Sequence, residues 1–299
     1  MVEELYRTPT PLPPAAAYWA SACATRSFKP LAIATLVTTP AYVEGANVLW
    51  ASLRQTLAPQ LRGRVDFVAL LVAEHGEAEA NATRQALHGW TGCVVPLIPP
   101  PYDGAVSFPR FREQFTKLAL WNATMYERVL YMDSDTLALG DVSPLLALPA
   151  SAPFAAVRDW ENGAVRAHFN MGVASLAPSA AEFTRLDAAR ATRRDYRMGM
   201  AEQGLLNAEY GGSFQELPFE YNGNLAAAAQ APAFWANASA TLRVIHYTWI
   251  KPFDPQAAKH RDYAACKAPL DTWLRARDDM LVELGIANAT SPPPGAPPG

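Results

Sequence analysis

The sequence predicts an α/β protein, a mostly parallel sheet flanked by helices and folded as a single domain. Short apolar runs rich in β-branched residues alternate with helical patterns along the chain. Such runs suit strands that are buried on both faces, and their alternation with helices favours parallel strands joined by right-handed crossovers. At 299 residues, 50% of them hydrophobic, the chain is long enough to bury one large core.

The expected elements follow one another from residue 31 onward. Strands are predicted over 31–38, 65–72, 94–98, 128–132, 169–176 and 242–247. Helices are predicted over 41–57, 77–88, 115–125, 178–190 and 201–208. Residues 1–29 and 287–299 are rich in Pro without steady periodicity, so they are expected to be an irregular lead-in and a tail, and 30–286 the domain.

Charge and composition exclude two classes of protein. The formal net charge is −3, whereas nucleic-acid-binding proteins usually carry a basic excess, so no nucleic-acid partner is expected. No stretch approaches the roughly 18 apolar residues of a membrane span. The cysteines Cys23, Cys93 and Cys266 lie far apart without CxxC spacing, which argues against a zinc ribbon or a disulfide framework. The odd number suits reduced thiols, with one disulfide plus one thiol as the alternative.

Two features give opposite indications about the compartment. The first thirty residues lack the basic start and apolar run of a signal peptide, and this favours a cytoplasmic location. Asn-x-Ser/Thr sequons begin at Asn81, Asn122, Asn237 and Asn288, whereas about one would occur by chance among ten asparagines. Asn122 falls in a helix expected to be packed, where a glycan would not fit. A Golgi or secretory location therefore stays open beside the cytoplasmic one.

The clearest chemical signal is the segment YMDSDT at 131–136. Asp133 and Asp135 follow a hydrophobic strand and converge on one point if the chain turns there. Hard cations such as Mn²⁺ and Mg²⁺ take oxygen ligands and complete their shells with substrate phosphates. Two carboxylates alone would repel a leaving diphosphate, but with a divalent ion between them the site attracts it. The pattern predicts a metal site that grips a diphosphate.

Several separated blocks resemble the glycogenin-type family 8 glycosyltransferases. They are TLVTTPAYVEGANVLWASLRQT (35–56), FTKLALWNATMYERVLYMDSDTLALGDVSPLL (115–146), FNMGV (169–173), EQGLLN (202–207), LPFEYN (217–222) and HYTWIKPF (246–253), in the family's order. The resemblance implies a GT-A fold with a Rossmann-like sheet, a UDP-sugar donor, Mn²⁺ (with Mg²⁺ as the alternative) and transfer that retains the anomeric configuration.

The resemblance also implies a role for each residue at the matching positions. The expected metal ligands are Asp133, Asp135 and His246, and the expected nucleotide-sugar contacts are Leu36, Thr38, Thr39, Tyr42, Lys117, Ser134 and Lys251. The expected catalytic and donor-sugar residues are Lys117, Asn170, Glu202 and Gln203. Glu202 is expected to stabilise positive charge on the sugar or to act as a transient nucleophile, with a front-side mechanism as the alternative.

This sequence departs from the family pattern at several of these positions. Thr39 replaces an Asn in the uridine turn, and Gly199 replaces an acidic residue. The loop after His246 is one residue shorter than in glycogenin and carries Trp249 in place of a glycine. The segment 223–235, which matches the self-glucosylated stretch of glycogenin, contains no tyrosine, so self-priming there is excluded by residue type.

The expected partners follow from these departures. They are a UDP-sugar, a separate acceptor (a saccharide, an inositol or a glycoconjugate) and a second copy of the chain as a homodimer. Two alternatives stay open, an inositol galactosyltransferase like galactinol synthase and a catalytically inactive nucleotide-sugar-binding scaffold. A phosphatase of the haloacid dehalogenase class is disfavoured because its DxD motif normally opens the domain, whereas about 100 residues precede this one.

Overall fold

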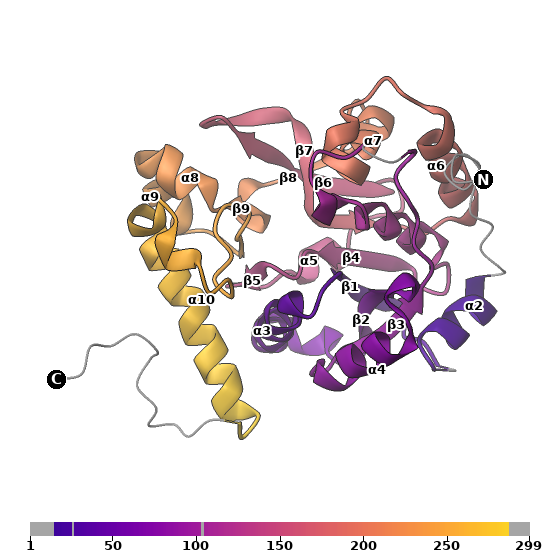
Figure 1. Ribbon diagram of the computed structural model, residues 1–299, viewed down its shortest axis with the longest axis horizontal. Coiled ribbons are helices and arrows are strands. Elements are labelled where there is room, and N and C mark those ends of the chain that lie inside the picture. Colours follow the sequence, from indigo (N-terminus) through magenta and orange to yellow (C-terminus); the bar gives the residue numbers. More distant parts are fainter. Residues whose placement is uncertain (1–14, 26, 103–104, 287–299) are drawn as a thin grey trace.

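The computed structural model describes residues 15–25, 27–102 and 105–286 and contains one large and one small sheet (Figure 1). In spatial order the large sheet comprises β3 (Thr91–Val95), β2 (Val65–Val72), β1 (Leu31–Val37), β4 (Arg128–Met132), β7 (Ala164–Leu176), β6 (Phe154–Glu161) and β8 (Gln215–Leu217). Only β7 runs against its neighbours, so the predicted mostly parallel sheet is confirmed.

Helices cover both faces of the large sheet (Figure 1). The α-helices are α2 (Ala15–Ala22), α3 (Ala41–Thr56), α4 (Glu77–Ala86), α5 (Ser143–Leu146), α6 (Ala180–Thr192), α7 (Ala201–Tyr210), α8 (Ala226–Gln230), α9 (Pro232–Ser239) and α10 (Tyr263–Glu283). Successive residues of β1 alternate between two cores, Ala32 with Phe115 and Leu205 on one face and Ile33 with Leu49 on the other. Burial on both faces explains the unbroken apolar run of this strand.

The small sheet carries a distant part of the chain to the turn after β4. It comprises β5 (Thr136–Ala138), β10 (Val244–His246) and β9 (Gly223–Asn224). In the pairing of β5 with β10, His246 lies opposite Thr136, and in the pairing of β10 with β9 it lies opposite Asn224. The backbone ladder therefore places His246 next to the two aspartates of the DxD segment.

Three predicted elements differ in kind or position, and one of them is the strand predicted over 169–176, which begins five residues earlier as β7. The segment predicted as a helix over 115–125 is a 3₁₀-helix, η4 (Gln114–Asn122), and the predicted strand 94–98 is β3, which begins three residues earlier. Every residue of η4 after Gln114 is buried. A segment that is buried all round has no polar face, so its periodicity cannot distinguish a 3₁₀-helix from an α-helix.

The lead-in expected to be irregular over 1–29 contains α2. This helix docks on the core through Trp19, which is fully buried, and Cys23 at its end forms a disulfide with Cys93 in β3. Cys266 remains a buried free thiol, so the alternative of one disulfide plus one thiol holds. The tail expected over 287–299 lies outside the described residues. Across the described ranges, no helix combines the length and apolar character that crossing a bilayer requires.

We expect the disulfide to contribute substantially to stability. The two cysteines are separated by 70 residues, and closing a loop of that length in the unfolded chain is worth about 4 kcal/mol in the chain-entropy model. The double variant Cys23→Ser/Cys93→Ser should lose about 2–4 kcal/mol of unfolding free energy in urea denaturation. Dithiothreitol should lower the stability of the wild type but not that of the variant; equal sensitivity of both proteins would contradict the assignment.

Candidate active site

A cavity of about 370 Å³ is lined by residues in or just after four strands of the large sheet. Leu36 at the end of β1, Asp133 after β4 and Asp159 in β6 line it, together with Asn170 from the antiparallel strand β7. In open α/β sheets ligands bind beyond the carboxyl ends of the strands, which is where this cavity lies. The small sheet contributes Asn224 and His246 to its wall.

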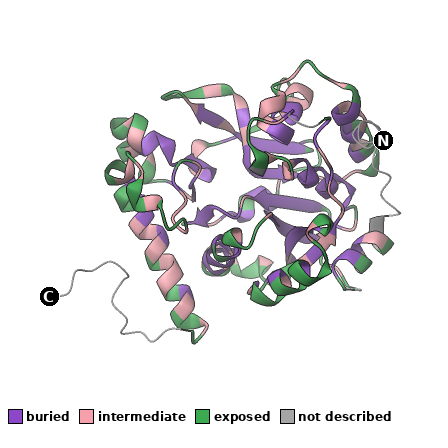
Figure 2. Ribbon diagram, in the orientation of Figure 1, coloured by how far each residue is buried: buried purple, intermediate pink, exposed green. Residues whose placement is uncertain are grey.

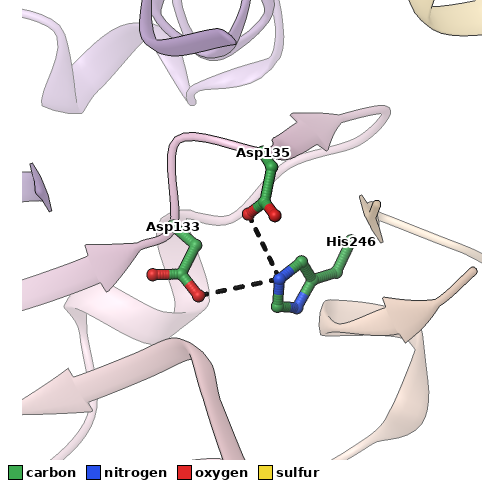
Figure 3. A group of neighbouring side chains, drawn as sticks. All are labelled: Asp133, Asp135 and His246. Carbon is green, nitrogen blue, oxygen red and sulfur yellow. Dashed lines mark ion pairs between the residues drawn. The ribbon is translucent and has the colours of Figure 1, made fainter. Parts of the chain in front are cut away.

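The DxD turn is fixed by backbone hydrogen bonds at both ends. The N–H of Asp133 donates to the Gly172 carbonyl at 2.8 Å, and the N–H of Tyr247 donates to the Asp135 carbonyl at 2.9 Å. Both carboxylates point toward the imidazole of His246 (Figure 3). One ligand atom from each of these three side chains lies within 4.8 Å of the others. This arrangement could hold one metal ion.

A relay of amide side chains fixes the orientation of His246. The Asp159 carboxylate only accepts, so Asn170 Nδ2 donates to it at 3.2 Å, and Asn170 Oδ1 accepts from the Gly172 N–H at 2.8 Å. The same oxygen accepts from Asn222 Nδ2 at 3.0 Å, which turns Asn222 Oδ1 toward His246 Nδ1, also 3.0 Å away. His246 Nδ1 must therefore donate. Its Nε2 lone pair then faces the aspartates, as a metal ligand requires.

Two glycines allow backbone to approach this cluster closely. A Cβ atom on Gly172 would lie 2.1 Å from Cε1 of His246, so a side chain there would displace the imidazole. A Cβ atom on Gly45 in α3 would lie 2.4 Å from the Ser134 carbonyl oxygen, so the helix contacts the DxD turn only because it has glycine there. The FNMGV block therefore needs glycine at this position, because a side chain would clash with His246.

Two lysines balance the charge of the aspartates. Buried Lys117 contacts Asp133 at 3.0 Å and Glu202 at 2.8 Å, and its Nζ lies 4.8 Å from the ring centre of Tyr131. Lys251 pairs with Asp135 and also donates to the Tyr247 carbonyl at 2.8 Å. Each of these carboxyl groups therefore has a lysine partner within a largely buried wall.

The pKa values of the cluster follow from burial and these pairs. Burial opposes ionisation of Asp135, but its pairing with Lys251 and its contact with His246 hold its pKa below the ordinary value. Burial would lower the pKa of Lys117, but Asp133 and Glu202 together raise it. The pKa of Glu202 is raised, because burial outweighs the attraction of Lys117 and Asp133 adds repulsion. Lys117 is thus cationic, and Glu202 takes up a proton more readily than an ordinary glutamate.

Asp159, which the sequence analysis missed, organises the side of the cavity beyond the metal ligands. It is buried and accepts from Gln203 Nε2 at 3.0 Å, from Asn170 Nδ2 at 3.2 Å and from Asn224 Nδ2 at 3.5 Å. Gln203 Oε1 in turn accepts from the Met171 N–H at 3.0 Å. The signal was present: Asp159 closely follows the apolar run 154–157, much as Asp133 follows its strand.

All the predicted site residues line the cavity except Thr39. Thr39 is exposed and lines a small separate depression, and its expected uridine contact stays a prediction. The ring of Tyr42 packs edge-on against Phe253 with centroids 5.3 Å apart. The hydroxyl of Ser134 donates to the Leu36 carbonyl at 3.4 Å, which joins two of the expected nucleotide contacts. The roles assigned to these residues stay predictions.

Replacing Lys117 should destabilise the folded protein, because its two carboxylate neighbours would lose their cation. Lys117→Met leaves Asp133 and Glu202 without their shared cation, so the free energy of unfolding should fall by about 3 kcal/mol at pH 8. Without the cation the folded-state pKa of Glu202 rises further above its unfolded value, so the folded state takes up the extra proton. The loss should therefore shrink as the pH is lowered to 5.

The double variant Lys117→Met/Glu202→Gln gives the matched control in urea denaturation. It removes the buried carboxylate, so it should recover part of the lost stability at pH 8 and abolish most of the difference between the two pH values. An equal loss in the single variant at both pH values would contradict the assigned charge arrangement.

Comparison with known proteins agrees with the motifs and the geometry. A family model described as glycosyl transferase family 8 matches residues 112–255. Glycogenin from Neurospora crassa is 26% identical over 219 residues, which are 72% of this chain and 30% of the relative. Glycogenin-1 from Caenorhabditis elegans is 27% identical over 238 residues, 76% of this chain and 51% of the relative. The chain thus spans no more than about half the length of these two relatives.

Solved structures show the same fold at low identity. The apo form of the glycosyltransferase GlyE from Streptococcus pneumoniae superposes with a TM-score of 0.55 at 16% identity, covering 90% of this chain and 66% of that one. The galactosyltransferase LgtC, in complex with donor and acceptor sugar analogues, gives 0.52 at 18% identity, covering 83% and 95%. Both likenesses support the GT-A fold. The ordered motifs, the matched family model and the glycogenin relatives together support a family 8 glycosyltransferase with a glycogenin-like sequence.

Proposed function

We propose that this protein is a retaining hexosyltransferase that moves glucose, galactose or a related sugar from a UDP-sugar to a separate acceptor, with Mn²⁺ as cofactor. The observation that carries the proposal is the cluster of Asp133, Asp135 and His246, whose ligand atoms lie within 4.8 Å of one another at a cavity wall. Family membership supports the reaction class, since a relative and a structural neighbour are named as transferases of sugars.

The donor atoms of the cluster fit a divalent cation. Two carboxylates and the Nε2 lone pair of His246 offer two oxygen ligands and one nitrogen ligand. An imidazole ligand favours Mn²⁺ over Mg²⁺, which prefers oxygen atoms alone. When bound, such an ion supplies Lewis-acid stabilisation for the negative charge of a departing diphosphate.

The lysines of the cluster are placed to share in this task. Lys251 lies at the cavity wall beside Asp135, where its ammonium group can stabilise the charge of a leaving UDP. Lys117 stays between Asp133 and Glu202 and keeps both carboxylates in place. Glu202 also lines the cavity, where it can stabilise positive charge on the sugar or act as a transient nucleophile.

The network around Asp159 is suited to orient a donor hexose. Asn170, Gln203 and Asp159 present amide and carboxylate groups to the cavity and fix one another through hydrogen bonds. Hydroxyl groups of a sugar are recognised by such preordered donors and acceptors, and losing one contact leaves a buried polar group unpaired. Their position beyond the metal cluster matches the hexose end of a nucleotide sugar.

The acceptor is proposed to be a separate molecule. The segment 223–235 forms β9, α8 and the start of α9, and its residues Asn224, Ala226 and Gln230 line the cavity without any tyrosine among them. A saccharide, an inositol or a glycoconjugate is the expected class. An inositol phosphorylceramide glucuronosyltransferase from Arabidopsis thaliana, 28% identical over 60% of this chain and 30% of its own length, supports an inositol-containing acceptor.

One observation favours a nucleotide-sugar-binding scaffold without catalysis as a second candidate. Where the family carries an acidic residue this chain has Gly199, and a Cβ atom there would lie 2.2 Å from the Ser107 hydroxyl oxygen. An acid at this position would need the Ser107 side chain to rotate away. A panel of UDP-sugars assayed for Mn²⁺-dependent UDP release distinguishes the two candidates, since a scaffold would bind a UDP-sugar and release no UDP.

The variant Asp135→Asn tests the metal site directly. It removes a charged ligand, so sugar transfer and the Mn²⁺-dependent thermal stabilisation by UDP should both disappear. Asp141→Asn is the matched control, because Asp141 lies outside the cavity and accepts a bond from the Ser143 N–H that an Asn can also accept. Retained activity in the Asp135 variant, or equal losses in both variants, would refute the metal assignment.

The orientation of His246 makes a second prediction about the metal. Asn222→Ala removes the oxygen that accepts from His246 Nδ1, so Mn²⁺ should bind about 10–100-fold more weakly in calorimetry. Asn222→Asp loses the same Nδ2 donor but keeps an accepting oxygen, and should retain most of the affinity. Equal weakening in both variants would show that the accepting oxygen does not orient the imidazole.

A further inference from the structure

Three of the four sequons lie in the described part of the chain, and the fold exposes two of them and buries the third. Asn81 in α4 and Asn237 in α9 are exposed, and these helices present exposed residues in Figure 2. Asn122 at the end of η4 is 5% exposed, and its Nδ2 atom is buried without a hydrogen-bond partner. Asn288 lies outside the described residues. The two exposed sequons have room for a bulky group and the buried one has none.

The disulfide is an independent observation that indicates the same compartment. Cys23 and Cys93 form a disulfide and are both buried, whereas Cys266 stays a thiol. Disulfides form and persist in oxidising compartments and are rare where glutathione keeps thiols reduced. The compartments of eukaryotic cells that form disulfides are also those that attach N-linked glycans.

Both exposed sequons lie away from the active-site cavity. Neither Asn81 nor Asn237 lines the cavity. Asn81 Oδ1 accepts from Arg84 at 3.3 Å, and Arg84 also donates to the Ala22 carbonyl at 3.0 Å, next to the disulfide. The hydroxyl of Ser239, the third residue of the Asn237 sequon, is exposed. A glycan on either asparagine is therefore compatible with binding in the cleft.

We propose that Asn81 and Asn237 carry N-linked glycans, and that the chain folds in an oxidising, glycosylating lumen. The donor is a lipid-linked oligosaccharide diphosphate. The bond between the anomeric carbon and the diphosphate oxygen breaks, a bond from that carbon to Nδ2 of the asparagine forms, and the amide loses one proton. Transfer precedes the formation of α4 and α9. A glycan on Asn122 would prevent η4 from packing, so the folded chain carries none there.

The first test uses the full chain recovered from the cells that make it naturally. Glycosidase release in heavy-oxygen water converts each glycosylated Asn to labelled Asp, which peptide mass spectrometry locates. Label is expected at both Asn81 and Asn237 and not at Asn122, and alkylation after denaturation without reductant should find one thiol. Absence of label from either exposed site, label at Asn122, or three free thiols would each overturn the proposal.

Matched variants extend the test in a eukaryotic host that secretes the full chain behind a cleavable signal sequence. Ser239→Ala should remove one glycan by intact mass, whereas Ser239→Thr keeps the sequon and should retain it. Asn81→Gln and Thr83→Ala should each remove the glycan on Asn81. Thr83 is buried, so only Asn81→Gln does this without changing a buried residue. An unchanged intact mass after the loss of either sequon would overturn the assignment of that site.

Discussion

The rest of the site depends on one constraint, which is that two aspartates are held next to one imidazole. The ligand atoms of Asp133, Asp135 and His246 lie within 4.8 Å of one another, and both carboxylates are at least partly buried. Like charges at this separation destabilise the fold unless cations offset them. Lys117 and Lys251 provide that offset from opposite sides, so the charge balance of the cleft is built into its wall.

The fold meets this constraint with rigid elements. The backbone of Asp133 is bonded to Gly172 in β7, and that of Asp135 to Tyr247 beside β10. Asp159, Asn170 and Asn222 link the expected sugar-binding side of the cavity to the imidazole through an unbroken chain of hydrogen bonds. The expected metal ligands and the expected donor-sugar contacts therefore belong to one hydrogen-bonded network, so a displacement of Asn170 would also shift His246.

The departures from the family pattern fall at Thr39 in the expected uridine turn, at Gly199 and in the loop after His246. The tyrosine expected for self-priming is also absent from 223–235. The DxD turn and its lysines keep the family arrangement.

The sequence by itself determined the strands that are buried on both faces, because an apolar run such as 65–72 matches β2 from end to end. It also located the DxD turn and the ordered blocks, since both depend on local residue types. It misjudged Gln114–Asn122, whose uniform burial hides the helical period, and missed α2, whose docking depends on Trp19 and on Cys93 far along the chain. It also missed Asp159 and the orienting role of Asn222. Only the tertiary structure decided these points. The pairing of β5 with β10 and the amide relay join segments that are distant in sequence. No local pattern encodes which distant partner satisfies a buried polar group.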